Sequence, residues 1–168
     1  MSKRSSFDRN PRDNYPTPYE AVVPLLPWLP PYTNYCEPCV GEGKLVDHLA
    51  KHGHFATETF DIAVDATKMN TVDVGHAAGM IITNPPWGRP VLHEIIKRCT
   101  EIRPAWLLVD ADWAYTKQAK PYLEHCSMII SIGRVKWIPG SKYTGKDNCC
   151  WYKFETYKVP HAPMVINA

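Results

Sequence analysis

Apolar residues along the 168-residue chain form two kinds of pattern. Short continuous apolar runs between turn residues are typical of strands buried on both faces, whereas apolar residues at i, i+3, i+4 and i+7 are typical of an amphipathic helix. In "VLHEIIKRCTEI", Leu92, Ile95, Ile96 and Cys99 have the helical spacing. The predicted strands lie at residues 34–36, 54–60, 79–83, 105–111, 128–138 and 148–157.

Helices are predicted between these strands. They lie at residues 43–52, 91–102 and 116–126. The last is the weaker pattern, because Pro121 interrupts it. Near the N-terminus, the apolar residues that can share one face of a short helix are Val22, Val23, Leu25 and Leu26. Pro24 and Pro27 predict that this helix is brief or kinked.

The order of these elements predicts the fold class. Strand–helix–strand units in succession predict an α/β fold with a mostly parallel sheet, and the loop "PGSKYTGKD" predicts that the last two strands form an antiparallel pair. We expect one domain at residues 15–160, a flexible basic arm at residues 1–14 and a loose tail at residues 161–168. Ligands of such sheets bind beyond the carboxyl ends of the strands.

Composition narrows the functional classes. The apolar fraction of 45% is typical of a globular protein, and no apolar run is long enough to span a membrane. The polar N-terminus has no apolar segment typical of a secretory signal. We therefore expect a cytoplasmic protein, in a bacterium or a phage-infected cell, whose six cysteines are free thiols. The net charge of +2 does not by itself indicate a partner.

The glycine-containing loop at residues 37–43, "EPCVGEG", follows the first predicted strand and precedes a predicted helix. Gly41 and Gly43 allow a tight turn and the close approach of a ligand, and the helix directs its N-terminus into the loop. A plain tight turn into a helix would have the same letters. The loop alone therefore leaves a nucleotide site and a turn open.

Asp61 lies eighteen residues beyond Gly43, at the end of the second predicted strand. An acidic residue about this far from a glycine turn holds the ribose hydroxyl groups in dinucleotide-binding folds. Glu58 and Asp65 are close in sequence, so the choice among the three acids stays open, as does a structural role in capping the next turn. Asp61 fits best because the strand pattern ends there, and Asp65 could reach a purine amino group.

The apolar run "IIT" continues into Asn84, Pro85, Pro86 and Trp87. Asn84 offers a side-chain carbonyl, and Pro85, which has no N–H, holds its own carbonyl as a rigid second acceptor. Two acceptors fit an amino group with two hydrogens, and Trp87 offers a flat face to the ring that carries it. The tetrapeptide therefore predicts a site for an aromatic amine. A strand end followed by a merely proline-stiffened loop would not need both Asn84 and Trp87.

The glycine loop and "TNPPW" together resemble the motifs of S-adenosylmethionine-dependent amino-methyltransferases, and most closely the adenine-N6 DNA methyltransferases of small phage type. The resemblance spans most of the chain. "YPTP" at residues 15–18 resembles the segment that precedes the glycine motif, and "RVKWIPGSKYTGKDNCCWYKF" is similar to a late loop near the target base. Trp87 departs from the commoner Tyr or Phe, and the chain lacks the stretch that reads a target sequence in larger members.

The resemblance implies a Rossmann-like class I methyltransferase fold, S-adenosylmethionine as the cofactor, and methylation of adenine N6 in DNA. It assigns the target to Asn84, Pro85, Pro86 and Trp87. The implied cofactor residues are Tyr15, Thr17, Glu37, Pro38, Gly41, Gly43, Asp61 and Asp65. Hydrogen bonds from N6 to Asn84 and to the Pro85 carbonyl would free the nitrogen lone pair and stabilise the charge that develops during transfer.

Positive residues gather late in the chain. The candidate nucleic-acid contacts are Arg134, Lys136, Lys142, Tyr143 and Lys146. Basic residues interleaved with aromatic ones are typical of a nucleic-acid surface, although a solvated hairpin loop has the same composition. The arm at residues 1–14 is a second basic segment for the same polyanion. A base inside a duplex must flip out to reach a site of this kind.

No metal site is predicted. Cys36 and Cys39 form a CxxC pair, but the adjacent Cys149 and Cys150 do not supply the second pair that zinc needs. The histidines lack ligand spacing. Two acids that follow the run "WLLV", Asp110 and Asp112, are not assigned to the site.

Two rival functions stay open. One is the same chemistry on RNA adenine or on protein glutamine, because the tetrapeptide is specific for a planar nitrogen rather than for DNA. The other is a non-catalytic subunit that binds nucleic acid or cofactor. The small size favours low sequence specificity or help from a protein partner or a second copy of the chain.

Overall fold

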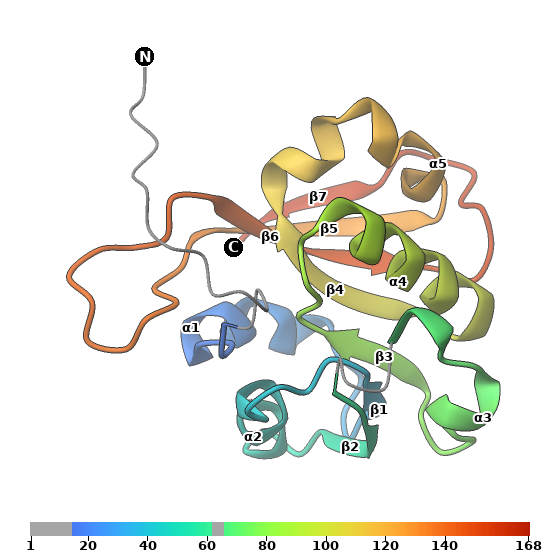
Figure 1. Ribbon diagram of the computed structural model, residues 1–168, viewed down its shortest axis with the longest axis horizontal. Coiled ribbons are helices and arrows are strands. Elements are labelled where there is room, and N and C mark those ends of the chain that lie inside the picture. Colours follow the sequence, from blue (N-terminus) through green and yellow to red (C-terminus); the bar gives the residue numbers. More distant parts are fainter. Residues whose placement is uncertain (1–14, 62–65) are drawn as a thin grey trace.

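The computed structural model describes residues 15–61 and 66–168 (Figure 1). The predicted arm at residues 1–14 and Asp65 lie outside the described residues. In the described part of the chain, seven strands form one sheet in the order β2-β1-β3-β4-β6-β5-β7. The strands are β1 Asn34–Glu37, β2 Phe55–Thr59, β3 Met80–Thr83, β4 Ala105–Asp110, β5 Cys126–Arg134, β6 Asn148–Phe154 and β7 Met164–Asn167.

Short helices connect the strands, and one long helix lies between β3 and β4. The α-helices are α1 Tyr19–Val22, α2 Lys44–Ala50, α3 Thr71–Val74, α4 Arg89–Ile102 and α5 Lys120–Leu123. The 3-10 helices are η1 Val23–Trp28, η3 Ala66–Lys68, η4 Ala111–Tyr115 and η5 Lys117–Ala119.

The strand directions confirm the predicted fold class. β1 pairs in parallel with β2 and β3, and β3 pairs in parallel with β4. β6 lies antiparallel between β4 and β5, as the long loop between the last two predicted strands indicated. The result is a mostly parallel α/β sheet with an antiparallel pair at one side.

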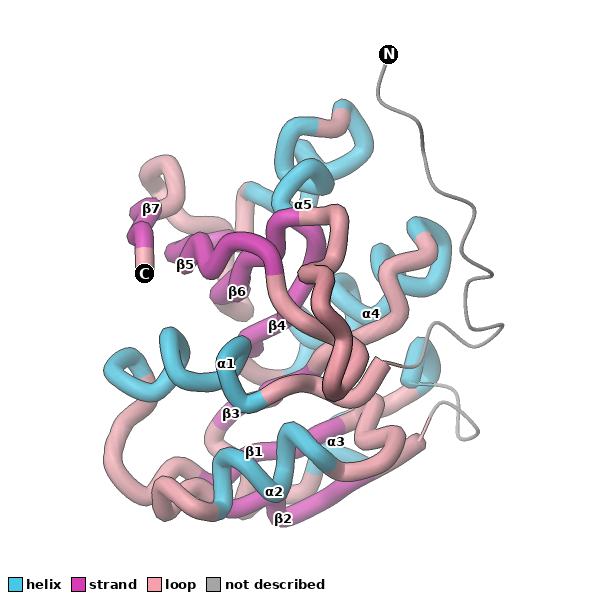
Figure 2. Tube along the Cα trace, turned by 90° about the vertical axis from the view of Figure 1, so that its left-hand side faces the viewer, coloured by secondary structure: helices cyan, strands magenta, loops and turns pink. Residues whose placement is uncertain are grey.

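Helices lie on both faces of the sheet (Figure 2), and each face carries a hydrophobic core. On one face, the apolar stripe of α4, including Leu92 and Ile96, packs against Ile81. On the other face, α1, η1 and α2 pack against Ile82 and Trp151. Every residue of β4 is buried, because a strand covered on both faces has no solvent side.

The N-terminal helix is shorter and more tightly wound than a single α-helix. Val22 and Leu25 are fully buried, whereas Val23 is 43% exposed, so the predicted four-residue face is wrong at Val23. The physical reason is the change to 3-10 winding at Val23, where Pro24 occupies the first turn. With three residues per turn, residues three apart share a side, and Val22 and Leu25 are three apart.

Pro121 has a different place from the predicted one. It lies in the first turn of α5 rather than inside a longer helix. Proline is tolerated there because the first-turn N–H groups have no partner within the helix. Pro121 therefore lies at the start of α5 instead of interrupting it.

The C-terminal residues correct the expectation of a loose tail at residues 161–168. Met164–Asn167 form β7, which pairs in parallel with β5 from Met128↔Met164 onward. The Ala168 N–H also donates a hydrogen bond to the Ser131 carbonyl at 3.1 Å. β6 pairs with only one side of β5, and the unpaired backbone groups on its other side can accept a further strand.

The sheet brings four loops to one edge. The carboxyl ends of β1, β3 and β4 are adjacent because these strands are parallel neighbours. β6 begins beside the end of β4, with Asp110 opposite Cys149, and Arg134 at the end of β5 lies opposite Asn148. The loop at residues 135–147 therefore leaves the sheet at the same edge as the other loops.

Removal of β7 tests whether the last residues of the chain contribute to the sheet. We expect a chain ending at Pro160 to lose about 1–3 kcal/mol of unfolding free energy, because the backbone hydrogen bonds between β5 and β7 are lost. Urea unfolding followed by circular dichroism measures this. Replacement of Tyr157, an exposed residue in the segment between β6 and β7, by Ser is the control and is expected to leave stability unchanged. An unchanged midpoint in the shortened chain would mean that the last residues behave as a tail.

Candidate active site

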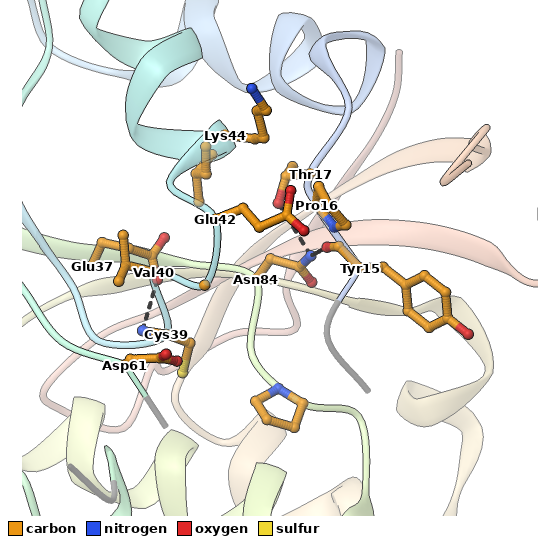
Figure 3. Close-up of a pocket in the computed structure, with 13 residues that line it drawn as sticks. Tyr15, Pro16, Thr17, Glu37, Cys39, Val40, Glu42, Lys44, Asp61 and Asn84 are labelled. Carbon is orange, nitrogen blue, oxygen red and sulfur yellow. Dashed lines mark hydrogen bonds between the residues drawn. The ribbon is translucent and has the colours of Figure 1, made fainter. Parts of the chain in front are cut away.

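A pocket lies at the carboxyl edge of the sheet (Figure 3). It is lined from four segments: the chain before α1, the end of β1 with its loop and the first turn of α2, the chain after β2, and the loop after β3. The predicted site residues that line it are Tyr15, Thr17, Glu37, Gly41, Asp61, Asn84 and Pro86. The fold therefore brings together predicted residues that are up to 71 positions apart in the sequence, from Tyr15 to Pro86.

Glu37 lines the pocket and is 1% exposed. One oxygen of its carboxyl, Oε1, accepts a hydrogen bond from the Cys39 N–H at 2.9 Å and another from the Thr83 hydroxyl. Burial raises the pKa of Glu37 to about 8, against these two hydrogen bonds, which lower it. Glu37 is therefore mostly protonated at neutral pH, and it joins the loop after β1 to the end of β3.

The glycine loop has the backbone that its letters predicted. Gly41 and Gly43 have φ of 49° and 75°, in the left-handed region that favours glycine. Gly43 is the N-cap of α2 and does not line the pocket. Pro38 is buried beneath the loop and does not line it either.

The three candidate ribose acids are now distinguished by position. Asp61 lines the pocket. Glu58 points elsewhere: a Cβ on Gly75 would lie 2.5 Å from its Oε1, and its Oε2 accepts a hydrogen bond from Thr57. Asp65 is outside the described residues. Among the described acids, the geometry favours Asp61 for contact with a ligand in this pocket.

Asn84 is held in one orientation by the segment before α1. Its Nδ2 donates to the Tyr15 carbonyl at 3.3 Å and to the Thr17 hydroxyl at 3.1 Å (Figure 3). A backbone carbonyl can only accept, so the amide nitrogen must face Tyr15. Thr17 is 5% exposed and therefore well fixed. With both amide hydrogens donated, the remaining polar atom of Asn84 is Oδ1, an acceptor.

Two contacts from β4 fix the loop that follows Asn84. The Trp87 indole N–H donates to the Leu108 carbonyl at 3.0 Å. The Arg89 guanidinium donates to both carboxylate oxygens of Asp110, at 2.9 and 3.4 Å. Asp110 Oδ1 also accepts the Trp113 N–H at 2.8 Å. Pro85 is buried, and Trp87 is half-buried between the two cores.

The predicted nucleic-acid contacts lie at the end of β5 and in the loop that joins β5 to β6. Arg134, Lys136, Lys142, Tyr143 and Lys146 are all exposed, Tyr143 by 79%. They do not line the pocket. They lie on the same edge of the sheet, because β6 begins beside the end of β4.

Several residues of the site were not predicted from the sequence. The further pocket-lining residues are Pro16, Cys39, Val40, Glu42, Lys44 and Leu45. Most belong to the loop at residues 37–43 or to the first turn of α2, so treating the whole loop as ligand-facing would have found them. The contact between Arg89 and Asp110 could not be predicted from a local sequence pattern, because the two residues are 21 positions apart.

Three further findings concern the described residues only. All six cysteines are free. Within residues 15–61 and 66–168, no three His, Cys, Asp or Glu side chains are grouped as metal ligands would be. In the same part of the chain, no helix has both the length and the apolar character that crossing a membrane requires.

Comparison with known proteins gives the fold. No protein-family model matches the chain, and no curated protein matches it in sequence. The structure is similar to that of a candidate RNA methyltransferase from Pyrococcus horikoshii, with 19% identity, a TM-score of 0.56 and 94% of each chain covered. It is also similar to a candidate class I S-adenosylmethionine-dependent methyltransferase from Listeria monocytogenes, with 12% identity, a TM-score of 0.54, and 88% of this chain and 63% of that chain covered. The chain has the class I methyltransferase fold.

Glu37 predicts a pH dependence of stability. A carboxyl whose pKa is raised from 4.5 to about 8 binds its proton more tightly in the folded state. Its stabilising effect is complete below pH 4.5 and is lost as the pH rises towards 8, by at most about 1.4 kcal/mol per pH unit. Glu37→Gln keeps an acceptor oxygen and stays neutral, so we expect its unfolding free energy to vary less with pH in this range.

The measurement is urea unfolding at several pH values between 5 and 8, a window set by the raised pKa of Glu37. Glu42→Gln, at an exposed position of the same loop, is the control and should keep the wild-type pH dependence. Equal slopes for wild type and Glu37→Gln would contradict a protonated Glu37.

Asp110 predicts a separate effect on stability. Asp110→Asn keeps an oxygen for the Trp113 N–H but loses the charge that pairs with Arg89. We expect a loss of about 1–3 kcal/mol of unfolding free energy, because Asp110 is only 9% exposed and the charge of Arg89 is left without its counter-ion. Asp112→Asn, at an exposed position two residues on, should change stability by less than about 0.5 kcal/mol. Similar losses in both variants would refute the specific contact.

Proposed function

We propose that this chain is an S-adenosylmethionine-dependent methyltransferase that methylates the exocyclic N6 amino group of adenine in DNA. The proposal combines the pocket, the class I methyltransferase fold, and the likeness of "EPCVGEG" and "TNPPW" to the motifs of adenine-N6 DNA methyltransferases. One observation supports it above the others: the orientation of the Asn84 amide.

The Asn84 amide has both hydrogens donated to Tyr15 and Thr17. A ligand that approaches Asn84 from the pocket therefore meets an acceptor, Oδ1. An amino group has hydrogens to donate, and a ring nitrogen without a hydrogen does not. The site thus favours an amine over an unprotonated ring nitrogen as the group to be modified.

The rest of the pocket fits the methyl donor. Gly41 keeps the backbone open to a close ligand, and Asp61 offers a carboxylate that can accept from two ribose hydroxyl groups. Glu37, next to the loop, supplies a buried carboxyl that can ionise against a positive charge. When bound, S-adenosylmethionine supplies an activated methyl group on a positively charged sulfur.

Asn84 and Pro85 would act on the target nitrogen. The lone pair of an aromatic amine is delocalised into its ring, which makes the nitrogen a poor nucleophile. Hydrogen bonds accepted by Asn84 Oδ1 and by the Pro85 carbonyl favour a pyramidal nitrogen with a localised lone pair, and they stabilise the positive charge that develops on it. No strong general base is needed, because the proton leaves after the methyl group arrives.

The basic loop after β5 supports a nucleic-acid substrate. Its exposed lysines can contact phosphates, and nucleic-acid affinity depends largely on such contacts. A protein substrate would not require this charge. The choice of DNA over RNA comes from the resemblance of the two motifs, and it is the part of the proposal that the substrate assay decides.

The test is methyl transfer from labelled S-adenosylmethionine to DNA, RNA and protein in parallel, followed by mass spectrometry of the nucleosides. We expect N6-methyladenine in DNA. Asn84→Ala should lower the rate by about 10²–10³ with little change in cofactor affinity, because it removes one group that stabilises the transition state. Asn34→Ala, at the exposed start of β1, is the matched control.

Thr17 variants test the orientation of the Asn84 amide separately. Thr17→Val removes the hydroxyl that accepts from Asn84 at nearly constant volume, and Thr17→Ser retains it. We expect a slower rate in the first variant and a nearly normal rate in the second. Label in RNA or in protein glutamine alone would move the substrate but keep the chemistry. No label in any substrate, with cofactor bound, would refute an autonomous enzyme.

A further inference from the structure

A closed set of contacts joins the start of α4 to the segment after β4. Its members, which we call the α4 network, are Arg89, Asp110, Trp113 and His93. Arg89 donates to the Asp110 carboxylate at 2.9 and 3.4 Å, and Asp110 Oδ1 accepts the backbone N–H of Trp113 at 2.8 Å. The Trp113 indole N–H donates to His93 Nε2 at 3.1 Å. His93 and Arg89 lie one turn apart on α4, which closes the set.

The α4 network continues from the loop that holds the proposed target residues. Trp87 lies two residues before Arg89, the first residue of α4. β4 holds this loop twice, through the Leu108 carbonyl to the Trp87 indole and through the Asp110 carboxylate to Arg89. Loss of the second contact would leave one of these two supports. The position of Asn84, where the loop begins, therefore depends in part on the α4 network.

The hydrogen bond between Trp113 and His93 requires a neutral imidazole. An indole N–H can only donate, so His93 Nε2 has no hydrogen, and Nδ1 carries the one hydrogen of the neutral ring. Protonation would place an N–H on both ring nitrogens, and two donors would then face each other. Trp113 is fully buried, so its indole would lose its acceptor without gaining contact with bulk water. A buried donor without an acceptor is costly.

The surroundings of His93 also disfavour its charged form. The imidazole stacks on Tyr122 of α5, with 4.6 Å between centroids and 23° between planes, and α5 lies beside α4 (Figure 1). Arg89 is the cation on its own helix, and the nearby carboxylate of Asp110 is paired with Arg89. Burial and the positive charge of Arg89 lower the pKa of His93 from its ordinary value of 6.5. His93 is therefore neutral at pH 7.

We propose that His93 is a positioning residue for the reaction: its neutral imidazole, as the acceptor for Trp113, keeps the start of α4 and the loop at Asn84 in the reactive arrangement. Protonation of His93 opens the α4 network and slows methyl transfer. His93 and Trp113 do not line the pocket, so they act through Asp110 and Arg89. The inference rests on the proposed function for its effect on the rate, but its effect on the contacts is independent of any substrate.

The direction of the pH effect follows from the lowered pKa of His93. The folded state binds the proton less tightly than the unfolded chain does. The stabilising effect of neutral His93 is therefore present above pH 6.5 and is lost as the pH falls through the lowered pKa. Glu37 acts in the opposite direction, because its raised pKa favours folding as the pH falls. Variants that all retain Glu37 isolate the effect of His93.

The first experiment measures kcat/KM for DNA methylation between pH 5 and 8 in wild type, His93→Gln and His93→Leu. Glutamine can accept the indole N–H and does not titrate. We expect wild type to lose about 5- to 150-fold at acid pH, the range for one buried donor without its acceptor. His93→Gln should keep the rate at pH 7.5 and lose less at acid pH, whereas His93→Leu should be slow throughout. His76→Gln, at an exposed histidine, is the matched control with the wild-type profile.

The second experiment needs no turnover. It follows the indole N–H signals of ¹⁵N-labelled protein and their protection from exchange, corrected for intrinsic exchange at each pH. As His93 is protonated, Trp113 should lose at least about 5-fold of its protection, and Trp87 should follow because its loop loosens. Trp151 donates to the Ala21 carbonyl in the core on the other face of the sheet, so it is the internal control and should stay protected. In His93→Gln none of the three signals should change.

The outcomes distinguish this inference from the proposed function. An equal loss of kcat/KM at acid pH in wild type and His93→Gln would overturn the role of His93 and leave the proposed function standing. Exchange at Trp113 without a change at Trp87 or in the rate would also overturn it. Absence of methyl transfer to any substrate, with Trp113 and Trp87 losing protection together, would overturn the proposed function but support the coupling. Circular dichroism melting shows that each variant is folded under assay conditions, and His93→Gln decides the test if His93→Leu is not.

Discussion

The carboxyl of Glu37 is the contact on which the candidate site depends. It accepts hydrogen bonds from the Cys39 N–H in the loop after β1 and from the Thr83 hydroxyl at the end of β3. These strands are parallel neighbours, so their carboxyl ends lie side by side, but side-by-side ends do not by themselves fix two loops relative to each other. Glu37 does so, and Asn84 follows Thr83 directly.

A buried carboxyl is stable in this place only when its charge is avoided or compensated. Burial raises the pKa of Glu37, so the neutral acid predominates at pH 7. A neutral acid can be buried at much lower cost than a carboxylate, and it still accepts both hydrogen bonds. A cationic ligand in the pocket would favour the ionised form instead, so the same residue can serve the empty and the occupied pocket.

The other supports of the site are contacts between residues far apart in the sequence. The segment before α1 fixes the Asn84 amide, and α1 is itself held to β6 because the Trp151 indole N–H donates to the Ala21 carbonyl at 2.7 Å. β4 holds the loop after β3 through Leu108 and Asp110. The loop after Asn84 therefore cannot shift without breaking contacts on more than one side, which suits the proposed methyl transfer, a reaction that needs two reactants held in line.

The sequence by itself determined the α/β class, the direction of most strands, and the loops at residues 37–43 and 84–87, because apolar periodicity, glycine and proline act over a few residues. It did not determine β7, since a short, exposed strand has no periodicity of its own and depends on the open side of β5. It favoured Asp61 among the acids Glu58, Asp61 and Asp65 because the strand pattern ends there, and the structure adds that Asp61 lines the pocket while Glu58 is directed towards Gly75. The tertiary structure alone decided three features: the orientation of the Asn84 amide, the contact of Arg89 with Asp110, and the approach of Trp137 to Trp87. Each of them joins residues far apart in the chain through side-chain geometry, which no local sequence pattern encodes.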